Sequence, residues 1–257
     1  MQQKKVVVIG SGLGGLSAGV ILAKNGYQVT VLEQGQQIGG CLQCFSRYGA
    51  KYETGMHFIG SVVPGQTLRK LMNYLELTAD VPLSFLDQSG YDVVALQGEQ
   101  FRFANGREPF IETMSSYFPR QRDALARYFD LVSRVAGASS LHSLKYAESD
   151  AAINTEFQLR AINDVLDELF DDELLKRVLV GNLPLYAAEQ DKTPFSTHAF
   201  IMDFYNQSAA RVVGGSDSIA TSLKNTILRY GGTVKTRQKV TKIVCDEAKA
   251  TGVVVND

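Results

Sequence analysis

Apolar and polar positions near the start of the chain alternate in the order of a strand, a turn, a helix and a second strand. The run of β-branched residues over 4–9 predicts a buried parallel strand. A helix is predicted over 16–25, because small residues line one face and Gly26 is a natural C-terminal cap. A second β-branched run over 28–32 predicts another strand, which ends at Glu33.

Helical and strand periodicities alternate through the middle of the chain. Apolar spacing predicts helices over 67–77, over 111–135 with a break near Pro119, and over 163–180, and strands over 93–96 and 100–103. Asn105-Gly106 is a turn signal after those two strands. From Val240 onwards the pattern predicts a strand, a turn and a further strand.

Composition and charge narrow the class of protein. The 257 residues are 45% apolar and 21% charged, which is ordinary for a globular protein with a core. A net charge of -1 supplies no basic field, so nucleic acid is not an expected partner. Three cysteines are too few for a secreted disulfide scaffold, and we expect a reducing, cytoplasmic setting. The apolar stretch over 6–23 contains five glycines, so strand, turn and helix explain it better than a signal peptide or membrane span.

The turn between the first strand and the helix has the spacing G-x-G-x-x-G at Gly10, Gly12 and Gly15. Gly10 allows the tight turn, Gly12 lets the main chain approach a pyrophosphate, and Gly15 lets the helix pack closely on the strand. The N-terminus of the helix then offers unpaired N–H groups to phosphate oxygens. Glu33 follows Gly15 by eighteen residues, where a carboxylate accepts hydrogen bonds from ribose hydroxyls. The pattern predicts a dinucleotide-binding βαβ unit.

A glycine pair, Gly39-Gly40, follows Glu33 and favours FAD over NAD as the dinucleotide. A second loop of bare main chain can pass close to the pyrophosphate and ribityl region of a longer cofactor. This arrangement resembles the FAD-binding fold shared by glutathione-reductase-like and amine-oxidase-like flavoproteins.

Two blocks of sequence resemble the phytoene desaturase, carotenoid isomerase and retinol saturase family of FAD-dependent oxidoreductases. The first block is "IGGCLQCFSRYGAKYETGMHFIG" over 38–60, and the second is "GGSDSIATSLKNTILRYGGTVKTRQKVTKI" over 214–243. The sequence departs from the family at Cys41, where wider desaturases often carry arginine, and at Cys44, where threonine or serine is usual. The resemblance therefore supports the cofactor site more strongly than it supports the surface that would bind the substrate.

The resemblance implies a fold, a cofactor and a reaction class. We expect an α/β protein with a Rossmann-like FAD/NAD(P)-binding domain of the amine-oxidase and glutathione-reductase type, and an inserted α+β substrate cap domain. The expected segments are 1–66 and 211–257 for the FAD domain and 67–210 for the cap domain. Family members are about twice as long, so the chain is expected to be an N-terminal fragment. The implied reaction is saturation or desaturation of carbon–carbon double bonds in a polyene or isoprenoid such as a retinoid or carotenoid.

The predicted site combines the glycine motifs with what the resemblance implies. Val240 is implied to meet the adenine through its backbone. NAD(P)H is a candidate electron donor. The substrate is expected to be small and hydrophobic. Peripheral membrane contact is also expected, although the sequence does not indicate which residues make it. The predicted cofactor-binding residues are Gly10, Gly12, Leu13, Gly14, Gly15, Glu33, Gln34, Gly39, Gly40, Cys41, Gly55, Met56, His57 and Val240.

Three alternatives remain open at this stage. Cys41-x-x-Cys44 permits a flavin-dependent thiol or disulfide oxidoreductase, although disulfide reductases place four residues between their cysteines. His57 is either a proton donor to a substrate carbon or a structural histidine beside the flavin ring. A non-enzymatic lipid-binding escort protein on the same fold would need no flavin. His142 and His198 are expected to be ordinary residues of the cap domain, and no metal site is expected.

Overall fold

Distant parts of the chain meet in one parallel sheet. The computed structural model describes residues 4–144 and 151–256. Strands β1 (Lys5–Ile9), β2 (Gln28–Leu32) and β10 (Thr233–Lys235) form a three-stranded sheet with β2 in the centre. Val8 pairs with Val31, and Val31 also pairs with Val234, so all three strands run parallel. The second block of sequence, over 214–243, thus adds its strand β10 to the βαβ unit at the start of the chain.

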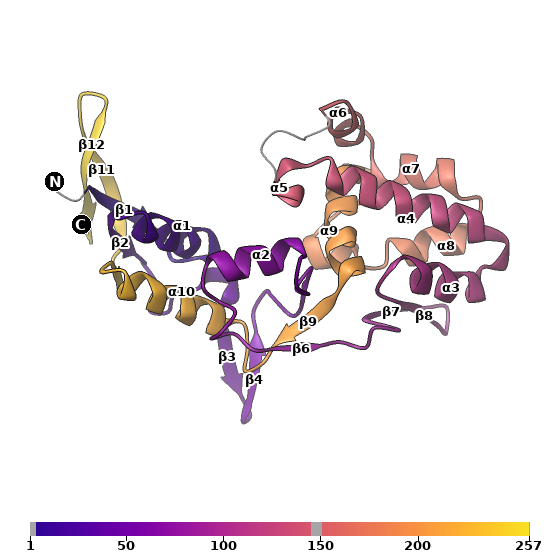
Figure 1. The fold of residues 1–257 in the computed structure, drawn as a ribbon, viewed down its shortest axis with the longest axis horizontal. Helices are drawn as coiled ribbons and strands as arrows, with labels where there is room; N and C mark the ends of the chain where they lie inside the picture. The colour runs from indigo at the N-terminus through magenta and orange to yellow at the C-terminus, as the bar shows by residue number, and fades with distance from the viewer. Residues whose placement is uncertain (1–3, 145–150, 257) are drawn as a thin grey trace. The chain divides into compact units, whose positions relative to one another are not determined.

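Helices α1 (Leu13–Lys24) and α10 (Asp217–Arg229) pack against each other and against this sheet (Figure 1). The two helices approach closely because α1 carries Gly19 at the contact. A Cβ on Gly19 would lie 2.8 Å from the Ile227 side chain and 3.2 Å from that of Val31. Leu16 and Leu223 are fully buried beside them, which gives this layer its apolar core.

The chain falls into two compact units. The first comprises Met1–Phe58, Lys70–Ser84 and Arg211–Asp257, and the second comprises Ile59–Arg69 and Phe85–Ala210. The remaining elements of the first unit include η1 (Gly40–Leu42) and two antiparallel hairpins, β3 (Cys44–Arg47) with β4 (Ala50–Glu53) and β11 (Val240–Asp246) with β12 (Lys249–Val255). The chain passes between the units within α2 (Thr67–Tyr74), β6 (Leu83–Phe85) and β9 (Ala209–Val212).

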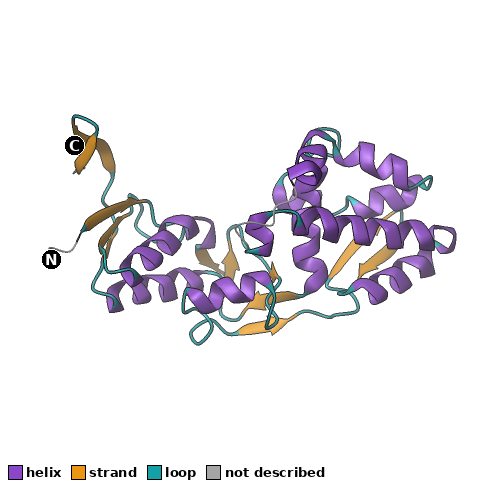
Figure 2. Ribbon diagram, turned by 45° about the horizontal axis from the view of Figure 1, so that its top comes forward, coloured by secondary structure: helices purple, strands orange, loops and turns teal. Residues whose placement is uncertain are grey.

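The second unit is mainly helical, with short strands at its side (Figure 2). Helices α4 and α9 make its central contact, and Tyr128 on α4 and His198 on α9 are fully buried there. Its elements are β5 (Ile59–Gly60), β7 (Asp92–Leu96), β8 (Glu99–Phe103), α3 (Arg107–Tyr117), η2 (Pro119–Gln121), α4 (Arg122–Gly137), α5 (Ser140–Ser143), α6 (Ala151–Leu159), α7 (Ile162–Leu169), α8 (Glu173–Leu179), η3 (Leu183–Tyr186) and α9 (Phe195–Gln207).

Most predicted elements are present, but one helix prediction is wrong. The helix predicted over 163–180 is two helices, α7 and α8, with a break at 170–172. Phe170 has extended backbone angles, and the Asp172 side chain caps α8 by accepting a hydrogen bond of 3.0 Å from the Leu175 N–H. Because Phe170 is buried, it continues the apolar pattern across the break and hides it from a periodicity argument.

The predicted fold class is confirmed: the chain is α/β, with a parallel βαβ unit and a second unit of helices and short strands. The domain limits expected at residues 66 and 210 stay predictions. No helix in residues 4–144 and 151–256 is long and apolar enough to cross a membrane.

Candidate cofactor site

The glycine-rich turn has the geometry that its spacing predicts. Gly10 has a φ of 94°, which favours glycine, and its N–H donates to the Leu32 carbonyl at 2.8 Å. A Cβ on Gly15 would lie 2.1 Å from the Gly10 carbonyl oxygen, so only glycine allows α1 to approach the turn. Apart from the adjoining residues and the backbone of α1 itself, no described heavy atom lies within 4 Å of the position that a Cβ would take on Gly12 or Gly14. The turn therefore leaves bare main chain facing open space at the N-terminus of α1.

Glu33 lies at the carboxyl end of β2 and is held by donors from two loops. Its Oε2 accepts hydrogen bonds from the Ser11 N–H at 2.9 Å and the Ser11 hydroxyl at 2.7 Å, and its Oε1 accepts from the Gly35 N–H at 2.7 Å. Desolvation raises the pKa of this carboxyl, but the hydrogen bonds from Gly35 and Ser11 outweigh it, so the pKa is lowered. Glu33 is therefore an ionised acceptor beside the turn.

The glycine pair lies directly against the first turn. Gly39 forms a parallel bridge with Gly12, and its N–H donates to the Ser11 carbonyl at 2.9 Å. Gly39 has a φ of 110°, and a Cβ on Gly40 would lie 3.2 Å from the Gly12 Cα. The structure thus brings the two predicted glycine loops together, and glycine is favoured at Gly39 by its φ and at Gly40 by the close approach to Gly12.

The segment before Val240 runs beside Glu33. The Glu33 N–H donates to the Lys235 carbonyl at 2.8 Å, and the Gln238 N–H donates back to the Glu33 carbonyl at 2.8 Å. The Arg237 N–H donates to the Gly35 carbonyl at 2.9 Å. Val240 starts β11 two residues after Gln238, and its predicted backbone contact with the adenine stays a prediction.

Residues 55–57 follow the β3–β4 hairpin and approach the second glycine loop. A Cβ on Gly55 would lie 3.3 Å from the Cys41 Cβ, and the Thr54 N–H donates to the Gln43 carbonyl at 3.1 Å. His57 is exposed at 59% of its side chain, and its Nδ1 lies 4.0 Å from Oε2 of Glu53. His57 thus lies next to a carboxylate and is open to solvent. Gln34 and Leu13 are also exposed, beside Glu33 and at the start of α1.

The cysteines show no bond that would define a redox pair. Cys41, Cys44 and Cys245 are free thiols in the described part of the chain. Cys41 lies in η1, whereas Cys44 starts β3, with its Sγ 3.5 Å from the Ser216 hydroxyl. Over residues 4–144 and 151–256, histidine, cysteine and carboxylate side chains form no group of three that could hold a metal ion.

Sequence reasoning missed the role of Ser11. It is fully buried, and both its N–H and its hydroxyl hold the Glu33 carboxylate. A small hydroxyl residue between the first two glycines of the motif is the signal that would have identified it. Both remaining histidines are buried in the second unit: His198 is fully buried, and the His142 Nε2 lies 2.7 Å from Oδ2 of Asp203.

Named relatives match almost the whole chain. It is 33% identical to all-trans-retinol 13,14-reductase of Rattus norvegicus over 97% of this chain and 44% of that protein. It is 23% identical to 4,4'-diapolycopen-4-al dehydrogenase of Metabacillus indicus over 98% of this chain and 53% of that protein. The chain thus spans about half the length of these relatives. The predicted family resemblance is confirmed.

Solved structures share the fold at lower identity. An oxidoreductase from Methanosarcina mazei has a TM-score of 0.71 and 22% identity, covering 98% of this chain and 56% of that one. A Rab GDI from Plasmodium falciparum has a TM-score of 0.57 and 14% identity, covering 99% of this chain and 63% of that one. Residues 13–257 match the family model for flavin containing amine oxidoreductases, and the chain belongs to that family.

Proposed function

We propose that the protein is an FAD-dependent oxidoreductase that saturates or desaturates carbon–carbon double bonds in a polyene or isoprenoid, such as a retinoid or carotenoid. Family membership supports the flavin, and the names of the retinol reductase and the diapolycopenal dehydrogenase support the substrate class. The observation that carries the proposal is the pair of glycine loops that meet at Gly12 and Gly39 beside an ionised Glu33.

The residues at this site fit FAD. The missing Cβ atoms of Gly12 and Gly14 leave room for a pyrophosphate at the N-terminus of α1, whose first turn has no side-chain cap. The Glu33 carboxylate accepts hydrogen bonds from Ser11, Gly35 and the Gln34 backbone, and Glu33 is only partly buried, so a ribose hydroxyl would approach it from the open side. Gly39, Gly40 and residues 55–57 would line the path from the pyrophosphate towards the flavin ring.

The chain's own residues would orient the substrate and move a proton. A bound flavin supplies the exchange of hydride with a substrate carbon. His57 would hold the accompanying proton on Nε2, because its Nδ1 faces the Glu53 carboxylate. Glu53 is itself held by a 2.7 Å ion pair with Arg211, and its side chain is only 7% exposed, so a negative charge stays near the imidazole.

The direction of the reaction depends on the electron partner, and for saturation we propose NAD(P)H. Two electrons must enter for every double bond that is reduced, and NAD(P)H is the hydride donor used by many flavoproteins. We also propose a cytoplasmic location, because free thiols suit a reducing compartment.

We propose peripheral membrane contact through the outer face of the β3–β4 hairpin. Tyr48 at its tip is 90% exposed, and Phe45 and Tyr52 stack with ring centroids 5.4 Å apart while remaining about half exposed. The Arg47 guanidinium lies over the Tyr48 ring at 5.0 Å. Aromatic rings with a neighbouring cation favour the interface of an anionic bilayer, from which a lipid-soluble substrate would be taken.

The visible spectrum of the purified protein tests the proposed function. The account predicts a yellow protein whose flavin band, after reduction, returns when a reducible polyene is added without oxygen, or bleaches when a desaturable one is added. Loss of turnover in Cys41→Ser and Cys44→Ser would favour a thiol oxidoreductase instead. A colourless protein that rejects FAD would favour a lipid-binding escort.

A further inference from the structure

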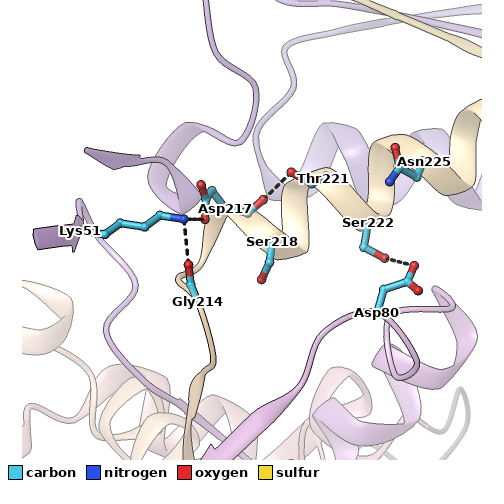
Figure 3. A pocket seen from close by; sticks show the side chains of 8 residues that line it. All are labelled: Lys51, Asp80, Gly214, Asp217, Ser218, Thr221, Ser222 and Asn225. Carbon is cyan, nitrogen blue, oxygen red and sulfur yellow. Dashed lines mark hydrogen bonds and ion pairs between the residues drawn. The ribbon is translucent and has the colours of Figure 1, made fainter. Parts of the chain in front are cut away.

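The charged clefts of the two units differ in how their cations are paired. In the first unit, a cleft along the polar face of α10 is lined by Lys51, whose ammonium is already bound to Asp217 at 2.7 Å (Figure 3). In the second unit, Arg127 and Arg134 line another cavity, and neither guanidinium makes a hydrogen bond or an ion pair in the described part of the chain. These two guanidiniums therefore remain available to a partner.

The two arginines flank an apolar groove beside α4. Helices α4 and α7 contact each other in the second unit (Figure 1). A cavity of about 370 Å³ is lined by residues of both helices: Arg127, Asp130, Leu131, Arg134 and Leu169. The two arginines lie two helical turns apart, about 10 Å along α4. Asp130 accepts hydrogen bonds from Arg107 at both of its oxygens, at 2.7 and 2.8 Å, so the two free guanidiniums leave this end of the surface positive.

The adjoining part of the same surface is negative. A cavity of about 610 Å³ shares two residues with the first and carries more carboxylates than arginines: Asp123, Asp167, Glu168, Asp171 and Asp172 against Arg120 and Arg127. Asp167 pairs with Lys176 at 2.6 Å, but the carboxylate is 62% exposed and the lysine only 15%. Glu168 pairs with Arg160 at 2.6 Å, and here the exposed fractions are 67% and 25%. The carboxylates therefore form the outer layer at this end.

We propose that this surface joins two copies of the chain in a symmetric dimer. We call it the α4–α7 surface, and it consists of Arg127, Leu131 and Arg134 on α4 and Asp167, Glu168 and Leu169 on α7. Around a two-fold axis every contact occurs twice, so the positive end of each copy lies on the negative end of the other. The two leucines lie between the ends and supply the apolar contact at the centre. The α4–α7 surface belongs wholly to the second unit and needs no flavin, so this inference is independent of the proposed function.

A second copy fits this charge pattern better than other kinds of partner do. An anionic membrane or a nucleic acid would be repelled by the outer carboxylates. A strongly acidic or strongly basic protein would match one end of the surface and be repelled by the other. A second copy matches both ends at once. The net charge of the chain is only -1, so long-range repulsion between two copies is small.

Charge reversal at each end, followed by sedimentation equilibrium, tests the dimer. Arg127→Glu with Arg134→Glu makes both ends negative, and Asp167→Lys with Glu168→Lys makes both ends positive. We expect each double variant to dimerise roughly a hundredfold more weakly than the wild type, because like charges then face each other across the interface. An equimolar mixture of the two variants should form a heterodimer about as strongly as the wild type dimerises, because opposite charges meet again at both ends.

The controls separate the interface from net charge and from folding. Lys242→Glu with Lys249→Glu alters the net charge as much as the arginine variant does, on the exposed β11–β12 hairpin, and should dimerise as the wild type does. Unfolding temperatures identify a variant that loses its fold. If the Asp167 and Glu168 variant does so, Asp123→Lys with Asp171→Lys takes its place, since neither of these carboxylates forms an ion pair in the described part of the chain.

Three results would overturn the inference. The first is a wild-type protein that stays monomeric up to about 1 mM, the range of the weakest specific complexes. The second is dimerisation of Arg127→Glu with Arg134→Glu at the wild-type strength. The third is a mixture of the two folded variants in which no heterodimer forms.

Discussion

Ser11 and Glu33 show how single residues prepare the site. The buried serine donates twice to one carboxylate oxygen, and Gly35 donates to the other, so the carboxylate is oriented before a ligand arrives. Glu33 was predictable because the glycine motif fixes its distance along the sequence. The hydrogen bonds from Ser11 to Glu33 and from Lys51 to Asp217 were not predictable. They join residues that are 22 and 166 positions apart in the sequence, and no spacing rule connects them.

Replacing Glu33 should weaken FAD binding more than it weakens the fold. In Glu33→Ala the ribose loses a charged acceptor, worth roughly 1.5–3 kcal/mol, so the dissociation constant should rise about tenfold to a hundredfold. Flavin fluorescence titration measures it. Glu247→Ala, which removes an exposed carboxylate from the β11–β12 turn, is the matched control. Equal affinities of the two variants would exclude a role for Glu33 in ribose binding.

His198 makes the stability of the second unit depend on pH. Its Nε2 lies 2.8 Å from the Tyr128 hydroxyl and its Nδ1 lies 2.8 Å from the Tyr186 hydroxyl. Burial lowers the pKa of His198 from 6.5 to about 4. Between these values the unfolded chain binds more protons than the folded one. The stabilising contribution is therefore complete above pH 6.5 and is lost as the pH falls towards 4.

His198→Gln should flatten this acid dependence. At about 1.4 kcal/mol per pH unit, the wild-type protein should lose about 3 kcal/mol of unfolding free energy across the window through His198 alone. Urea denaturation at pH 7.5, 6.0, 5.0 and 4.5 measures the slope. Gln190→Ala, which changes an exposed residue of the second unit that carries no titratable group, should keep the wild-type slope. An identical slope in His198→Gln would show that His198 does not titrate differently on folding.

At the scale of elements, long periodic segments with clear ends were predictable. Strands β1, β2, β7 and β8 and helices α1 and α2 lie close to the predicted ranges, because apolar spacing and glycine punctuation agree there. Helix α9 was not predicted, since its apolar and polar residues do not separate onto two faces; its buried positions include His198, Asp203 and Asn206. Asp203 accepts a 2.7 Å hydrogen bond from the Ser133 hydroxyl on α4, a tertiary contact that a local pattern does not reveal.

The exposed aromatic residues of the β3–β4 hairpin should determine how strongly the protein binds membranes. Tyr48→Ser combined with Phe45→Ser should reduce binding to vesicles of phosphatidylcholine and phosphatidylserine by about tenfold, because two interfacial aromatic rings are lost. Sedimentation with vesicles measures it. Tyr74→Ser, at a site about as exposed as Phe45, should bind as the wild type does. Vesicle binding that is unchanged in the hairpin variant would place the membrane contact elsewhere or exclude it.

At the scale of the whole molecule, the α/β class and the return of the chain into the first sheet were predictable, because a glycine motif and a second similar block mark the two ends of the insertion. The points at which the chain passes from one unit to the other were harder to predict. Residues 70–84 belong to the first unit although they follow residues of the second, and Asp80 from this segment accepts a 3.0 Å hydrogen bond from Ser222 on α10. The position of residues 70–84 depends on contacts between residues far apart in the sequence. Apolar periodicity reports only on neighbouring residues, so it does not predict such contacts.

The central claim is that the bare main chain at Gly12 holds a pyrophosphate, and a single substitution tests it directly. A methyl group on Gly12 meets no described protein atom within 4 Å, so Gly12→Ala should unfold at the wild-type temperature without cofactor. FAD should stabilise the wild-type protein in proportion to its concentration and affinity, and should stabilise Gly12→Ala far less. Gly252→Ala on β12, where a methyl group is equally unobstructed, should respond to FAD as the wild type does. Equal FAD-dependent shifts in unfolding temperature for Gly12→Ala and Gly252→Ala, or no shift in the wild type, would contradict the account.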